Sequence, residues 1–268
     1  MGSIRSAVLV KRGRIEGHIR PTGGRFAEAG LLPRPLTRFV APLFGVHCVD
    51  TTDRVFALTY DDGPHPVHTP RILDELREHN AHATFFVLLE PARRHPDIVR
   101  RIVAEGHEVA LHGVTHRSLL SIPARRAVDE IVAAREELER LAGAPVQLFR
   151  PPYGHHTPRQ ARLLRRHGLE LVIWSGDGLD WIDDAVDRVA ERAWASVFPG
   201  GILLLHDDRA DPETLKEGES LPRFDKAALT SMILEAATAA GFRGTTVGAL
   251  LRDHAWVVSG SREKMFTA

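Results

Sequence analysis

Two adjacent carboxylates, Asp61 and Asp62, follow an apolar run over residues 55–60 and precede a glycine and a proline, which end an extended strand. Anionic groups a few ångströms apart repel one another unless a cation, a strong hydrogen-bond donor or a proton compensates their charge. The same residue types also favour an ordinary turn, because Asp, Gly and Pro each stabilise turn backbones. The pair therefore indicates a site only if other parts of the chain supply a metal or an arginine.

A pair of histidines, His112 and His116, could supply ligands for such a metal. Neutral imidazole nitrogen is a preferred ligand of zinc and its neighbours, and histidines four positions apart can converge on one ion. The chain has 15 histidines, so one such pair also arises easily by chance. One carboxylate of the aspartate pair and the two histidines would make a set of three metal ligands. The second carboxylate of the pair would then remain outside the ligand set.

Polar residues follow three further apolar runs in the same way. They are Arg150 after residues 146–149, the segment 175–181 after residues 171–174, and His206 after residues 201–205. In parallel α/β proteins the active site lies outside the carboxyl ends of the strands, so this placement predicts that these residues converge. Each has a purely structural alternative, since a lone arginine is commonly ion-paired at the surface and a lone histidine behind a strand is commonly a core residue.

The order of these segments resembles the polysaccharide deacetylases, the carbohydrate esterases of family 4 that share the NodB homology domain. The resemblance covers residues 54–251 and includes all five motifs of that family. They are TFDDGP at 59–64, with Tyr60 in place of Phe, H(S/T)xxH at 112–116, an RxPxG-like motif at 150–154, DxxDW at 177–181 and LxH at 204–206. In the second motif Gly113 replaces the serine or threonine whose hydroxyl helps to hold the metal loop, and Thr115 is the candidate to substitute for it.

The resemblance implies a divalent metal, with zinc first and cobalt or nickel as alternatives, bound by Asp62, His112 and His116. The remaining coordination positions would take water and the acyl oxygen of the substrate. Asp61 would be the general base, and a partner such as Arg150 would hold it in place as an anion.

The resemblance also implies which residues act on the substrate. The backbone N–H of Tyr153 would stabilise the oxyanion together with the metal. His206 would protonate the leaving amine, and Asp180 would orient and charge that histidine. Trp181 and Leu204 would form apolar walls for the acetyl methyl group, with Tyr153 as a further substrate-binding residue.

The elements that must position these residues alternate between strands and helices. Helix signals are the Thr-Pro pairs at 69–70 and 157–158, Pro96 with Gly106 at the other end, and a long amphipathic segment between 121 and 143. Strand-like runs lie near 55–60, 83–88, 107–111, 146–149, 170–174, 201–205 and 244–247. This alternation predicts parallel strands joined by right-handed crossovers. We therefore expect an α/β fold, a distorted or incomplete (β/α) barrel of about seven parallel strands, which is also the NodB-like fold that the resemblance implies.

Length and composition fit one catalytic domain, because 268 residues can bury one large core. We expect residues 54–253 to form the polysaccharide deacetylase (NodB homology) catalytic domain and residues 1–53 an N-terminal extension that packs on the barrel or is partly flexible. Residues 254–268 are expected to be a C-terminal tail. With 35 basic and 35 acidic residues the chain gives no indication of nucleic acid as a partner. Its single cysteine excludes an internal disulfide.

The sequence contains no run of the roughly eighteen apolar residues that a membrane span needs. The apolar run 7–10 is too short for the core of a signal peptide. We therefore expect a cytoplasmic protein, or a secreted one if a leader has been removed. The polar segment 207–225 follows the proposed acid and is expected to shape the substrate cleft.

The sequence thus predicts a metal-dependent deacetylase, a hydrolase of non-peptide carbon–nitrogen bonds. Its expected substrate is the N-acetyl group of an amino sugar in a chitooligosaccharide, in peptidoglycan or in a related glycoconjugate. One alternative keeps the metal chemistry and changes the bond, either to an amide of a small biosynthetic intermediate or to an O-acetyl ester of acetylxylan.

Two further alternatives belong to other classes of protein. A non-haem iron oxygenase also uses two histidines and one carboxylate, but it has no need of Asp61, Arg150 and His206. A non-catalytic carbohydrate-binding protein needs neither Asp61 nor His206. The sequence gives no indication of the oligomeric state.

Overall fold

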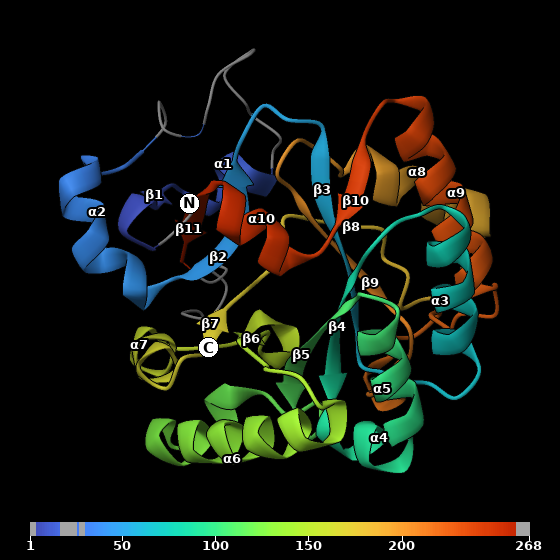
Figure 1. The fold of residues 1–268 in the computed structure, drawn as a ribbon, viewed down its shortest axis with the longest axis horizontal. Coiled ribbons are helices and arrows are strands. Elements are labelled where there is room, and N and C mark those ends of the chain that lie inside the picture. The colour runs from blue at the N-terminus through green and yellow to red at the C-terminus, as the bar shows by residue number, and fades with distance from the viewer. Residues whose placement is uncertain (1–3, 17–25, 27–29, 261–268) are drawn as a thin grey trace.

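The fold is a curled parallel sheet with helices along its outer side (Figure 1). A computed structural model describes residues 4–16, 26 and 30–260. Seven parallel strands form the sheet in the order β7-β6-β5-β4-β3-β9-β8, and β10 pairs with the beginning of β3. The strands are β3 (Val55–Asp61), β4 (Thr84–Leu88), β5 (Glu108–Gly113), β6 (Leu148–Phe149), β7 (Glu170–Leu171), β8 (Gly176–Asp177), β9 (Ile202–His206) and β10 (Arg243–Thr245). The predicted incomplete barrel is therefore confirmed.

The helices follow the strands as βα units. They are α3 (His68–Glu78), α4 (Leu89–Arg94), α5 (Pro96–Ala104), α6 (Ala124–Ala142), α7 (Pro158–Arg166), α8 (Val186–Ala195), α9 (Lys226–Ala239) and α10 (Val247–Asp253). Thr157 caps α7 as predicted, and Gln160 completes a capping box with it. Helix α3, in contrast, begins at His68, so Thr69 is not its cap; the Thr69 hydroxyl instead donates to the buried carboxylate of Asp207.

Alternation along β3 divides its side chains between two apolar layers. Phe56, Leu58 and Tyr60 pack under the outer helices, whereas Ala57 belongs to a second core on the inner side of the sheet. Successive side chains of a strand point to opposite faces, so Asp61 shares the inner face with Ala57. The strand pattern thus directs the side chain of Asp61 into the barrel.

A small second sheet lies against the inner side of the barrel, to the left in Figure 1. It has the order β1-β11-β2, with β1 (Val8–Leu9), β11 (Ala255–Ser259) and β2 (Gly45–Asp50). Single bridges join β2 to the main sheet, from Val46 to Val172 and from Cys48 to Gly201. Residues 45–50 of the expected extension are therefore part of the packed structure, and residues 255–259 of the expected tail form a strand.

The rest of the N-terminal segment has two short helices, α1 (Arg12–Glu16) and α2 (Arg34–Val40). Parts of both expected terminal segments, residues 1–3, 17–25, 27–29 and 261–268, lie outside the described residues. Among the residues that the structure does describe, no helix combines the length and the apolarity that crossing a bilayer requires.

Candidate active site

The proposed functional residues meet at the carboxyl ends of neighbouring strands. Asp61 is the last residue of β3 and stands opposite His206, the last residue of β9, in the register of the sheet. His112 lies near the end of β5, and Arg150 follows β6. Asp62 has a left-handed backbone with φ of 79°, which is uncommon for a residue with a side chain.

Asp62, His112 and His116 form a cluster that suits a metal ion. Oδ1 of Asp62 lies 3.5 Å from Nε2 of His112 and 3.6 Å from Nε2 of His116. Ligand atoms around a tetrahedral zinc with bonds of about 2.1 Å stand about 3.4 Å apart, so the spacing fits such an ion. Oδ1 of Asp62 is buried and makes no hydrogen bond within the described part of the chain, which leaves it available to a cation.

The protonation of His112 also fits a metal ligand. Its Nδ1 lies 2.7 Å from the carbonyl oxygen of Arg150, so Nδ1 carries the proton and Nε2 keeps its lone pair. Burial and the neighbouring His116 hold the pKa of His112 well below its ordinary value. The ring is therefore neutral, as coordination requires.

Asp61 has the arginine partner that the sequence predicted. Nη1 of Arg150 donates to Oδ1 of Asp61 at 2.6 Å and to the hydroxyl of Thr59 at 2.8 Å. The guanidinium also lies over the ring of Phe86, 4.0 Å from its centroid. Burial raises the pKa of Asp61 to about 6, although Arg150 and His206 act to lower it. A carboxylate with such a pKa is a stronger base than an ordinary aspartate and is still ionised at neutral pH.

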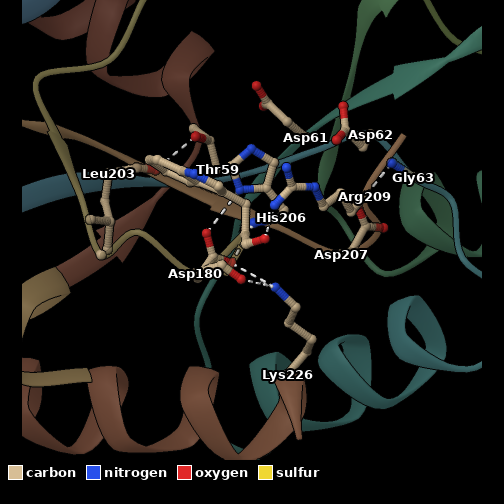
Figure 2. A network of polar contacts seen from close by, with 12 residues as sticks. Thr59, Asp61, Asp62, Gly63, Asp180, Leu203, His206, Asp207, Arg209 and Lys226 are labelled. Carbon is tan, nitrogen blue, oxygen red and sulfur yellow. Dashed lines mark hydrogen bonds and ion pairs between the residues drawn. The ribbon is translucent and has the colours of Figure 1, made fainter. Parts of the chain in front are cut away.

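His206 is oriented by Asp180, as expected, and Asp180 has a second partner that the sequence did not indicate (Figure 2). Nδ1 of His206 donates to Oδ1 of Asp180 at 2.8 Å, and Nζ of Lys226 lies 3.0 Å from Oδ2. Burial alone would lower the pKa of His206, but the charge and hydrogen bond of Asp180 outweigh it and raise the pKa to about 9. His206 is therefore protonated at neutral pH and can act as an acid.

Lys226 in turn explains why Asp180 remains an anion although it is fully buried. Burial would raise the pKa of Asp180, but Lys226 and His206 hold it below its usual range. Lys226 is the first residue of α9 and also donates to the backbone carbonyl of Asp180 at 2.6 Å. Figure 2 shows that Asp180 and Lys226 lie on the opposite side of the His206 imidazole from Asp61 and Asp62.

Tyr153 has a left-handed φ of 59° and lines the same cavity as Asp62, His112 and His116. Its ring meets that of His116 edge to face at 4.4 Å, and its hydroxyl donates to Asp211 at 2.8 Å. The ring of Trp181 meets that of His206 in the same way at 5.4 Å.

Most of these groups border one cavity of about 520 Å³. The predicted residues that line it are Asp61, Asp62, His112, His116, Tyr153, Trp181, Leu204 and His206. Arg150 and Asp180 lie behind its wall, against Asp61 and His206. The structure therefore brings every predicted site residue to one place.

The cavity also has walls that the sequence did not indicate. Arg12 and His47 come from the N-terminal segment and contact one another, and Trp174 lies beside them. The loop after β9 contributes Arg209, Asp211, Thr214, Lys216 and Glu219, as expected of a segment that shapes the cleft. No motif marks these residues; only the length and polarity of the 207–225 loop indicated a role for it.

Comparison with known proteins agrees with this site. The sequence profile of the polysaccharide deacetylase family matches residues 49–172. The chain is 40% identical over 187 residues to the chitooligosaccharide deacetylase of Sinorhizobium fredii, covering 69% of this chain and 86% of that protein. It is 31% identical over 206 residues to a peptidoglycan-N-acetylglucosamine deacetylase of Bacillus cereus, covering 76% of this chain and 91% of that one.

The fold is likewise that of solved family members. The crystal structure of the Bc1960 peptidoglycan N-acetylglucosamine deacetylase superposes with a TM-score of 0.68 and 31% identity, covering 77% of this chain and 92% of that one. The carbohydrate esterase of family 4 from Streptomyces lividans superposes with a TM-score of 0.64 and 25% identity, covering 79% of this chain and all of that one. The chain therefore belongs to the polysaccharide deacetylase family, the metal-dependent deacetylases of carbohydrate esterase family 4 that carry the NodB homology domain.

Proposed function

We propose that this protein uses zinc to hydrolyse the N-acetyl group of an acetylated amino sugar in a chitooligosaccharide, in peptidoglycan or in a related glycoconjugate. One observation carries the proposal: a base and an acid, Asp61 and His206, stand opposite each other on neighbouring strands and border the same cavity as the three-residue ligand set. Two of the relatives are named as deacetylases of chitooligosaccharide and of peptidoglycan N-acetylglucosamine, which supports this substrate class.

The ligand set is Asp62, His112 and His116, and its two nitrogens and one carboxylate oxygen favour zinc over harder cations such as magnesium. When bound there, zinc makes water more acidic and polarises the acyl oxygen of the substrate. Arg150 keeps Asp61 in a fixed orientation as an anion, so that Asp61 can take the proton of the attacking water.

The second half of the reaction needs a proton on the leaving nitrogen. His206 holds a proton because Asp180 stabilises the imidazolium, and it donates this proton as the carbon–nitrogen bond breaks. The backbone N–H of Tyr153 stabilises the negative charge on the acyl oxygen before that bond breaks. The products are acetate and the free amino sugar.

The shape of the cavity fits a short substrate. Its volume of about 520 Å³ lies within the range of about 300–1,000 Å³ that is typical of small-molecule sites. Trp181 and Leu204 supply apolar surface for an acetyl methyl group, and the 207–225 loop closes one side. We therefore propose a short oligosaccharide or one end of a longer chain as the bound part.

The test is the release of acetate from four kinds of substrate: chitooligosaccharides, peptidoglycan fragments, acetylxylan and small N-acetylated metabolites. The protein is first treated with a chelator and then reconstituted with zinc. We expect release from an amino sugar, loss of that activity on chelation and recovery with zinc. Release from acetylxylan alone would refute the N-acetyl specificity, and full activity after complete removal of metal would refute the mechanism.

A further inference from the structure

The backbone between His112 and His116 leaves little room for a side chain at position 113. Gly113 has φ of +136°, and a Cβ atom added there would stand 2.9 Å from the backbone oxygen of Thr115. A side chain at position 113 is therefore excluded by the path of the backbone. Thr115, which the sequence suggested as a substitute for the missing hydroxyl, is exposed to solvent.

The two histidines differ in how their second ring nitrogen is held. Nδ1 of His112 is fixed by the carbonyl oxygen of Arg150 within the barrel. Nδ1 of His116 is buried and makes no hydrogen bond within the described residues, and Oδ2 of Asp211, in the loop after β9, lies 3.3 Å from it. The carboxylate beside His116 thus comes from a segment far away in the sequence.

Asp211 is itself fixed from several sides and only 9% exposed. The hydroxyl of Tyr153 donates to its Oδ2 at 2.8 Å, and Nε of Arg209 lies 3.7 Å from its Oδ1. The neighbouring N–H of Ala210 donates to Oδ2 of Asp62 at 3.1 Å. Residues 210–211 therefore contact two of the three metal ligands, one through the backbone and one through a side chain.

We propose that Asp211 is a positioning residue of the metal site, which holds the ring of His116 from the loop after β9. In the proposed arrangement Oδ2 of Asp211 accepts a hydrogen bond from Nδ1–H of His116, which keeps Nε2 turned towards Asp62 and His112. A carboxylate behind a metal-bound histidine fixes the ring and makes it a stronger ligand, and its loss lowers metal affinity by about 10- to 100-fold. The inference rests on the ligand set of the proposed function but not on the identity of the substrate.

The same contacts link Tyr153, the proposed donor to the oxyanion, to the proposed metal ligand His116. Tyr153 contacts Asp211 through its hydroxyl and His116 through its ring. A change in the 207–225 loop therefore reaches both the ligand and the proposed oxyanion donor. For this reason activity alone cannot separate the two effects, and the test must measure metal binding directly.

The experiment compares zinc dissociation constants of the full chain and its variants by competition with a chromophoric chelator. We expect Asp211→Ala to weaken zinc binding by about 10- to 100-fold. Asp211→Asn, which keeps one acceptor oxygen, should lie in between, and Tyr153→Phe should weaken binding less than Asp211→Ala. Glu217→Ala is the matched control, because it removes an exposed carboxylate from the same loop and should leave the constant unchanged.

The cobalt(II)-substituted proteins provide a second measurement. A reoriented His116 should alter the visible d–d absorption in Asp211→Ala and not in Glu217→Ala. Unchanged zinc affinity together with an unchanged cobalt spectrum in Asp211→Ala would overturn the proposal, even if activity fell. If Asp211→Ala does not fold, the same comparison is made with Asp211→Asn and Tyr153→Phe, and wild-type affinity in both overturns it equally. Failure of the unmodified protein to act on amino sugars would leave this comparison intact.

Discussion

Nη1 of Arg150 lies 2.6 Å from Oδ1 of Asp61, and both side chains are closed to solvent. Removing one member of a buried ion pair leaves the other charge without compensation, which costs about 3–5 kcal/mol. We therefore expect Arg150→Met to lower the free energy of unfolding of the metal-free protein by about that amount. Urea denaturation measures it.

A double variant serves as the control for this pair. Asp61→Asn removes the charge that Arg150→Met leaves uncompensated, so the double variant should be more stable than Arg150→Met alone. Equal stability of the two would show that the arginine acts through its packing on Phe86 and not through the carboxylate.

The base assignment predicts a large loss of rate with little loss of binding. Asp61→Asn keeps the shape of the side chain but cannot take a proton, and loss of a general base lowers kcat by about 10²- to 10⁴-fold. Because Asp61 is not among the metal ligands, zinc content and KM should stay close to those of the unmodified protein. Steady-state kinetics with metal analysis checks both. A kcat within a few fold of the unmodified value would exclude Asp61 as the base.

The pair of His206 and Asp180 predicts how the rate depends on pH. The proposed mechanism requires the protonated form of His206, whose pKa is about 9, so the rate should fall as the pH rises through about 9. Asp180→Asn removes the charge that raises this pKa, while burial continues to lower it. The alkaline fall in rate should therefore move to lower pH in this variant. The pH profile of kcat measures the shift, and Asp129→Asn, on the exposed face of α6, should leave the profile in place.

Loss of the Asp207 carboxylate, which accepts a hydrogen bond from Gly63 of the first motif, should lower the stability of the protein. Its buried carboxylate accepts from the N–H of Gly63 at 3.0 Å and from the hydroxyl of Thr69. Asp207→Ala leaves both donors buried without an acceptor, each at a cost of about 1–3 kcal/mol. Thermal and urea unfolding should show Asp207→Ala to be clearly less stable than Asp207→Asn, which keeps one acceptor. Similar stability of the two variants would contradict this account.

Most strands of the main sheet and the main site residues could be predicted because their signals are local, whereas β8 and the strands of the small sheet were not predicted. An apolar run that ends in Asp, His or Arg describes a buried strand with a polar end, and parallel strands bring those ends together. Arg150 could be assigned to Asp61 for the same reason, since two adjacent anions need a positive partner. The convergence of these residues depends on short stretches of sequence and on the topology of the sheet, whereas their individual roles were implied by the resemblance to the polysaccharide deacetylases.

The remaining residues could not be predicted because their partners are distant and no motif marks them. Lys226 meets Asp180 across 46 positions of sequence, and it resembles any lysine at the beginning of a helix. Asp211 lies in a polar loop without periodicity. Thr69 looked like a helix cap until the tertiary contact with Asp207 was known, because a buried carboxylate outweighs a local capping preference.

The small sheet limits how far the chain can be shortened from its N-terminal side. Val8 and Val257 are register partners, so strands near the two ends of the described chain lie next to each other. A fragment that begins at residue 54 would keep all five motifs but lose β2, and it would uncover the strand edges that Val46 and Cys48 now bridge. Open strand edges pair with other molecules and cause aggregation. The smallest fragment that can be produced in soluble form is therefore longer than the stretch that carries the catalytic motifs.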